Sequence, residues 1–292
     1  MRARGHDGGM VAPDEPVPIR RATTPVRIVS VRSGEGHELP DTLVTEEPME
    51  IRVAPPGSES ERVAVTMRTP GHDFELAAGF LVNEGVIDPA GIAGIRYCAL
   101  ADQEQLYNTV TVDVRRPVDT RPARRTQPVS SACGVCGVTT LDDVAARCAP
   151  VKAGATVAHS VVLDLPARLR AGQRLFARTG GLHAAGLFTT SGELVAVRED
   201  IGRHNAVDKV VGWAALAGRV PLSDHVLMVS GRAGFEIAQK AAAAGIGVVA
   251  AVSAPSSLAV ATADRLGITL IGFLRADRYN IYSHPERVDI GA

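Results

Sequence analysis

Three short apolar runs in the second half of the chain constrain the fold most strongly. They span residues 226–230, 247–253 and 269–274, and alanine-rich segments of helical composition separate them. Strands that are apolar along their whole length are typical of a parallel sheet covered by helices on both faces. The runs therefore predict βαβ units and an α/β fold.

The segments before these runs predict two helices and a hairpin. Residues 166–178 read as a helix with proline in its first turn and Gly180 just after its end. Residues 204–217 place their apolar side chains on one helical face. Ser191 and Gly192 separate two β-like segments and suit a hairpin turn.

A hairpin followed by βαβ units resembles the architecture of cytidine deaminases, in which three layers surround a zinc site. Those enzymes place H-x-E at one helix start and P-C-x-x-C at another. Here no glutamate stands two residues after His183, and no cysteines follow Pro255. The sequence therefore predicts a deaminase-like domain without zinc, and no metal site. His183 is a candidate pocket residue, although a histidine bonded to nearby backbone is an equally good interpretation.

The first half of the chain predicts a smaller α+β domain. Val63, Val65 and Met67 alternate with polar or small residues, as on a half-buried strand, and residues 107–114 alternate likewise. Residues 73–86 between them predict a helix. The predicted organisation is a disordered tail over 1–24, an N-terminal α+β domain over 25–128, a thiol loop with its following helix over 129–150, and a deaminase-like cofactor-binding domain over 151–292.

Glycine and arginine follow the apolar runs. Ligands of parallel sheets bind at the carboxyl ends of the strands, where glycine and helix N-termini allow an anion to approach the backbone. Ser230, Gly231 and Arg232 follow the first run, and Arg275 and Arg278 follow the third. Together they suit a nucleotide diphosphate, although turn and helix-cap chemistry explains any one of these loops equally well.

The densest polar cluster of the second half covers residues 199–205. Asp200 either caps the helix that follows or binds a ligand. Arg203, His204 and Asn205 suit an anion or the edge of a base. A charged capping turn is the alternative, and the variety of polar groups favours binding.

Cys133 and Cys136 lie in a glycine-flanked segment that follows five arginines. A structural zinc site needs four ligands, and the other two cysteines form no second pair. A redox disulfide and a persulfide that carries sulfur are both open to this pair. The basic approach and the exposed setting favour sulfur carriage.

Charge and hydropathy limit the partners and the location. The formal net charge is −1, which gives no sign of a nucleic-acid partner. The sequence shows neither an apolar stretch long enough to span a bilayer nor a secretory signal. Four cysteines in 292 residues do not form a disulfide scaffold. We therefore expect a cytoplasmic protein without a membrane partner.

Several motifs, taken together and in order, resemble the FdhD family of formate dehydrogenase accessory sulfurtransferases. The likeness runs from about residue 26 to the C-terminus. The motifs are Ala-Cys-Gly-Val-Cys-Gly at 132–137, Thr-Gly-Gly-Leu-His-Ala-Ala at 179–185, the polar segment 198–209, Ser-Gly-Arg-Ala-Gly-Phe-Glu at 230–236, and two shorter matches at 47–52 and 67–71.

This resemblance implies a sulfurtransferase that acts through a cysteine persulfide. Cys133 would take sulfur from a cysteine desulfurase, with Cys136 as a helper. The sulfur would pass to the molybdenum bis(molybdopterin guanine dinucleotide) cofactor, the substrate here, which is destined for formate dehydrogenase; GDP is its expected analogue. A homodimer is also implied. The alternatives are a CxxC thiol–disulfide oxidoreductase and a molybdenum-cofactor chaperone without sulfur transfer. The implied cofactor-binding segment comprises Phe273, Leu274, Arg275, Ala276, Asp277 and Arg278.

Overall fold

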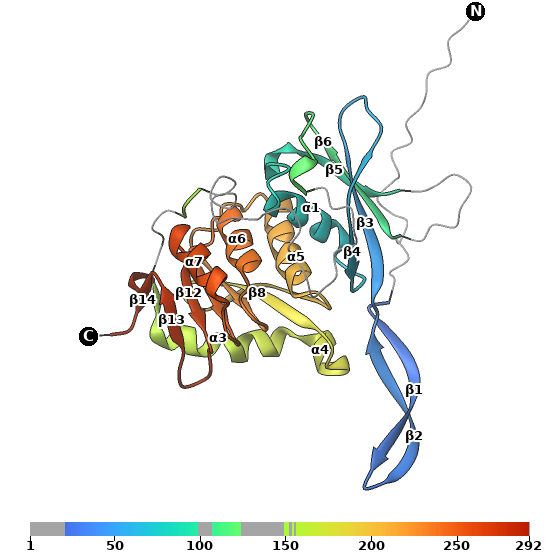
Figure 1. The fold of residues 1–292 in the computed structure, drawn as a ribbon, viewed down its shortest axis with the longest axis vertical. Helices are drawn as coiled ribbons and strands as arrows, with labels where there is room; N and C mark the ends of the chain where they lie inside the picture. Colours follow the sequence, from blue (N-terminus) through green and yellow to red (C-terminus); the bar gives the residue numbers. More distant parts are fainter. Residues whose placement is uncertain (1–20, 99–106, 124–148, 152–153, 155, 292) are drawn as a thin grey trace, which may run out of the picture.

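The computed structural model describes residues 21–98, 107–123, 149–151, 154 and 156–291. A six-stranded sheet forms the centre of the second half (Figure 1). Its strands, in spatial order, are β13 (Asn280–Ser283), β12 (Thr269–Gly272), β11 (Val248–Ala251), β10 (His225–Val229), β8 (His183–Thr189) and β9 (Leu194–Asp200).

Helices cover both faces of this sheet, so the second half has three layers (Figure 1). β10, β11 and β12 are parallel and, apart from His225 at the start of β10, fully buried, which confirms the predicted α/β class. The cytidine-deaminase likeness itself stays a prediction. One face carries α3 (His159–Gly172) and α4 (Arg174–Thr179), and the other carries α5 (Arg203–Leu216), α6 (Phe235–Ala243) and α7 (Ser257–Arg265).

The first half forms a four-stranded sheet with one helix against it. Val110, Val112 and Val114 are buried, as their alternation predicts. In the strand over residues 61–68, Val63 is buried as predicted, but Val65 and Met67 are only half-buried, so the predicted core face is wrong from Val65 on. In spatial order the elements are β4 (Glu61–Arg68), β3 (Glu47–Ala54), β6 (Thr109–Val114) and β5 (Ile92–Tyr97), with α1 (Asp73–Asn83).

Polar side chains occupy the buried face of β4 because each finds a partner there. Thr66 is 4% exposed and donates to the Asn205 side chain at 3.2 Å. Arg68 is fully buried and pairs with Asp73 at 2.8 Å. Burying such groups is tolerable only when they are hydrogen-bonded.

One hydrophobic core runs through both halves. It includes Ile51 and Val112 of the smaller sheet, Val211 of α5, and Leu227 and Val249 of the larger sheet. Helix α1 lies against α5 at the junction (Figure 1). The boundary predicted at 129–150 lies mostly outside the described residues, but the packing joins the two halves into one body.

The helix predicted for residues 166–178 is wrong in its start and its continuity. α3 begins at His159 and keeps Pro166 inside it, and it ends before Gln173. α4 is a separate short helix, which ends at Gly180 with φ 67°, as predicted. The apolar stripe of Val162, Leu165 and Leu169 fixes the earlier start, because it packs on the sheet.

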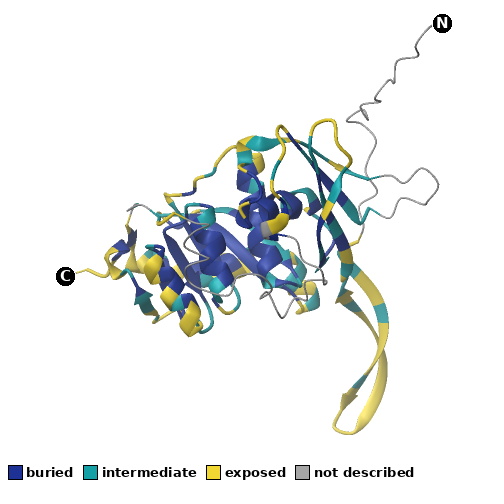
Figure 2. Ribbon diagram, turned by 45° about the horizontal axis from the view of Figure 1, so that its top comes forward, coloured by how far each residue is buried: buried dark blue, intermediate teal, exposed yellow. Residues whose placement is uncertain are grey.

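A β-hairpin near the N-terminus projects from the body (Figures 1 and 2). It pairs β1 (Thr23–Arg32) with β2 (Glu35–Val44), so the tail predicted for 1–24 extends too far by two residues at its end. Ser33 and Gly34 both have positive φ, as the tight turn of a two-residue hairpin requires. The remaining short elements are η1 (Pro89–Gly91), η2 (Arg121–Ala123), β7 (Val157–Ala158), η3 (Pro285–Arg287) and β14 (Val288–Asp289).

None of the described helices is long and apolar enough to cross a membrane.

Candidate functional site

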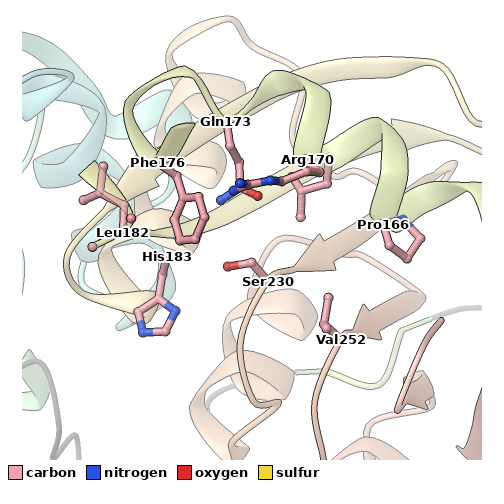
Figure 3. A pocket seen from close by; sticks show the side chains of 11 residues that line it. Pro166, Arg170, Gln173, Phe176, Leu182, His183, Ser230 and Val252 are labelled. Atoms are coloured by element: carbon pink, nitrogen blue, oxygen red, sulfur yellow. The ribbon is translucent and has the colours of Figure 1, made fainter. Parts of the chain in front are cut away.

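A cavity of about 610 Å³ lies between the α3–α4 layer and the carboxyl ends of β10 and β11 (Figure 3). Gln173 and Phe176 reach it from the helical side. His183, Ser230 and Val252 reach it from the sheet. The cavity therefore lies at the sheet edge that the apolar runs predict for a ligand.

Three strand-end loops, residues 230–234, 252–256 and 273–278, are joined to one another by backbone hydrogen bonds. Ser253 N donates to Gly231 O at 3.4 Å, and Phe273 N donates to Ser253 O at 3.2 Å. The structure thus brings the predicted segments together along one edge of the sheet.

The arginines of the third loop lie at its surface. Arg275 Nη1 donates to Val252 O at 2.5 Å, beside the residue that lines the cavity. Arg278 is exposed and pairs with Asp277 at 3.4 Å. Phe273 is 44% exposed, whereas Leu274 is fully buried in the core, so its side chain is not available to a ligand.

Two arginines and the carboxylate of Asp200 act on His183. Burial is the largest cause that lowers the pKa of His183, and the guanidinium groups of Arg203 and Arg232 lower it further. The imidazole is therefore neutral near neutral pH, with one nitrogen that donates and one that accepts. The adjacent arginines favour an anionic ligand at this end of the sheet.

Asp200 does not face the cavity. Its carboxylate is fully buried, pairs with Lys209 at 2.7 Å, and accepts hydrogen bonds from Gly202 N at 2.8 Å and Thr69 N at 3.2 Å. The predicted ligand role of Asp200 is therefore corrected to a structural one, because no part of the side chain is open to solvent.

The neighbouring residues of the polar cluster also bond internally. Asn205 Nδ2 donates to Asp200 Oδ1 at 2.9 Å and to Met67 O at 2.8 Å. His204 Nε2 lies 2.8 Å from a carboxylate oxygen of Glu236, and both side chains are nearly buried. Asn205 and His204 therefore hydrogen-bond the first turn of α5 to neighbouring segments, a structural role like the one that the capping alternative predicts.

The thiol pair, Cys133 and Cys136, lies outside the described residues, and its role stays a prediction. Cys98 is half-buried, with Sγ 2.9 Å from Thr111 Oγ1. Within the described ranges, no group of three or more histidine, cysteine or acidic residues could hold a metal ion.

The helical wall of the cavity was missed from sequence. Arg170, Gln173 and Phe176 lie in a segment that the sequence marks only as helical. Arg170 lies over the Phe176 ring, with 4.2 Å between the guanidinium carbon and the ring centroid. The sequence does place an arginine, a glutamine and a phenylalanine close together, at Arg170, Gln173 and Phe176, where the apolar helical pattern is interrupted. That grouping could have indicated a binding site.

The chain matches one protein family and is about half identical to several named relatives. The FdhD/NarQ family matches residues 44–289. The Sulfur carrier protein FdhD of Nocardia farcinica is 51% identical over 273 residues, covering 92% of this chain and 95% of the relative. That of Streptomyces coelicolor is 51% identical over 286 residues, covering 93% and 98%.

A solved structure supports the same grouping. The crystal structure of a proposed formate dehydrogenase accessory protein from Desulfotalea psychrophila matches with a TM-score of 0.74 and 26% sequence identity. The match covers 92% of this chain and 100% of that chain.

Proposed function

The chain belongs to the FdhD/NarQ family, and from this premise we propose that it is a sulfur carrier that transfers persulfide sulfur to the molybdenum cofactor of a formate dehydrogenase. The observation that carries the proposal is the thiol pair, Cys133 and Cys136, in a chain about half identical to proteins named sulfur carriers. The strand-end cavity and its arginines support a nucleotide-bearing substrate.

The first proposed step moves one sulfur atom. The Cys133 thiolate attacks the outer sulfur of the persulfide on a cysteine desulfurase. The sulfur–sulfur bond of the donor breaks, its cysteine leaves as thiolate, and a new sulfur–sulfur bond forms on Cys133. This exchange has no net oxidation and needs no further reagent.

The second proposed step delivers sulfur to the substrate. Cys136 attacks the inner sulfur of the Cys133 persulfide, and sulfide leaves toward the metal while a disulfide forms between the two cysteines. The two thiols supply the two electrons that reduce the sulfur. A cellular dithiol reductant then restores the pair.

The proposed substrate site consists of the strand-end loops. Arg232, Arg275 and Arg278 are exposed there, and guanidinium groups suit the phosphates of a guanine dinucleotide. We propose that the protein acts in the cytoplasm and as a homodimer, with a cysteine desulfurase as donor and formate dehydrogenase as the recipient of the sulfurated cofactor.

Persulfide formation tests the proposal. After incubation with a cysteine desulfurase and cysteine, intact-protein mass spectrometry should show a gain of one sulfur atom. Cys133→Ala should lose this gain completely, because it removes the attacking thiolate. The matched control Cys98→Ala should retain it. No gain in the wild-type protein contradicts sulfur carriage; cofactor binding without the gain would then favour a chaperone.

Nucleotide binding is tested separately by calorimetry with GDP. Replacing both Arg275 and Arg278 by alanine should weaken binding by about tenfold or more, because a hydrogen bond to a charged group contributes about 1.5–3 kcal/mol. The control is Arg27→Ala, on the distant hairpin. Affinity that is equal in all three proteins would show that the phosphates bind elsewhere.

A further inference from the structure

We propose that Glu199 is a positioning residue, which holds α4 in place over the sheet and thereby sets the width of the cavity at Phe176. Glu199 is not among the described residues that line the cavity, and it acts through the backbone of α4. The inference rests on the proposed nucleotide site, and it gives a role to a residue that the sulfur-transfer chemistry does not use.

The carboxylate of Glu199 accepts two hydrogen bonds from the first turn of α4. Leu175 N donates to Oε2 at 2.9 Å, and Phe176 N donates to Oε1 at 2.7 Å. The first N–H groups of a helix have no partner within the helix, and a carboxylate is a strong acceptor for them. Because each oxygen takes one of two successive N–H groups, both the distance and the direction of the helix start are fixed.

The helix α4 has few other anchors. None of its six residues is buried, and helices of this length are unstable on their own. Gln173, with ψ 77°, separates α4 from α3, and its side chain makes no capping hydrogen bond. At the other end Gly180 N donates back to Phe176 O at 2.8 Å, which is a bond within the segment itself. Glu199 therefore supplies, from another element, the N-terminal cap that the local sequence lacks.

Glu199 also connects α4 to the opposite wall of the cavity. It belongs to β9, which pairs with β8 so that Ala184 lies opposite Glu199 and His183 lies opposite Asp200. His183 reaches the cavity from β8, and Phe176 reaches it from α4 (Figure 3). The carboxylate therefore fixes the helical wall relative to the strand pair that carries His183.

A cap that serves only the stability of α4 is the alternative role for Glu199. The place of the bonds favours positioning, because one of the two N–H groups belongs to Phe176 itself. The Phe176 ring also stacks with Arg170, whose guanidinium carbon lies 4.2 Å from the ring centroid. A shift of the Phe176 backbone would move this stacked pair, and both of its members line the cavity.

Hydrogen exchange on the full chain without ligand tests the positioning directly. Glu199→Gln keeps the size of the side chain, but its amide has one acceptor oxygen and turns a donor toward the second N–H group. Mass spectrometry of the peptide that covers residues 174–179 should show exchange about tenfold faster than in the wild-type protein, because a hydrogen bond to a charged group is lost. Peptides from α5 should exchange at the wild-type rate.

The matched control is Glu193→Gln, which makes the same chemical change at an exposed residue just before β9. In this variant α4 should exchange as in the wild-type protein. Equal exchange over residues 174–179 in Glu199→Gln and Glu193→Gln would overturn the inference.

Calorimetry with GDP then tests whether Glu199 acts through Phe176. Glu199→Gln should weaken GDP binding by about tenfold, and Glu193→Gln should leave it unchanged. In a Phe176→Ala background the same change at Glu199 should cost less than about twofold, because the ring that Glu199 positions is gone. An equal loss in both backgrounds would show that Glu199 acts by another route. Faster exchange with unchanged GDP affinity would leave Glu199 as a helix cap only, and either result overturns the inference.

The two proposals fail in different ways. A wild-type protein that does not bind GDP contradicts the proposed nucleotide site, whereas the exchange comparison uses no ligand and still decides the role of Glu199. Persulfide formation on Cys133 should be normal in Glu199→Gln; its absence from the wild-type protein is instead a failure of the proposed sulfur carriage.

Discussion

Replacing Lys209 by methionine is expected to lower the free energy of unfolding by about 3–5 kcal/mol, because it leaves a buried carboxylate without its counter-charge. The Lys209 side chain is 1% exposed, and its ammonium lies 2.7 Å from Asp200 Oδ2. The same ammonium donates to Thr69 O at 2.9 Å. Methionine has a similar length, so the loss reports the charge and not a cavity.

Urea unfolding followed by circular dichroism measures this effect. The control Arg27→Met breaks an ion pair with Glu38 on the hairpin, where both side chains are more than 70% exposed. Exposed pairs contribute only about 0–1 kcal/mol. If Lys209→Met costs no more than Arg27→Met, the pair with Asp200 does not hold the fold together. Lys209→Met combined with Asp200→Leu should recover part of the loss.

The hydrogen-bond network around Asp200 and Asn205 also links the two halves of the chain. It joins Thr66 of β4 to Asn205 in the first turn of α5, and Thr69, just after β4, to Asp200 at the end of β9. The smaller sheet is therefore bonded to β9 and α5 of the second half. A single unfolding transition is expected from such a shared core.

The α/β fold could be predicted because it depends on local patterns. The apolar runs that became β10, β11 and β12 are buried on both faces, which a sequence records directly. The role of Asp200 could not be predicted in the same way. Its partner Thr69 lies 131 residues away, and a capping network and an anion site use the same residue types.

The candidate site likewise contains some residues that the sequence predicts and others that it does not. Ser230 could be placed because strand ends of parallel sheets meet at one edge, and His183 because it stands where the deaminase pattern has its histidine. Gln173 could not, because the proline inside α3 suggested a later helix start and a continuous helix. What decided the true boundaries was packing on the sheet, which is a tertiary effect that propensity does not report.

Replacing Gly79 by alanine is expected to lower the free energy of unfolding by about 3 kcal/mol, because α1 and α5 touch backbone to backbone there. A Cβ on Gly79 would clash with the carbonyl oxygen of Asp208 and lie 2.7 Å from Gly212 N. A Cβ on Gly212 would clash in turn with the Glu75 carbonyl. Neither neighbour is a flexible side chain, so the helices must separate and the core between the two sheets must open.

The sign of this effect is diagnostic. In a helix without such a contact, glycine to alanine is favourable by about 0.5–1 kcal/mol, so a loss of stability can come only from the crossing. Gly91→Ala is the control, since nothing lies within 4 Å of its Cβ position. Urea denaturation of both variants makes the comparison. If the two variants have the same free energy of unfolding, α1 and α5 do not cross at Gly79 and Gly212.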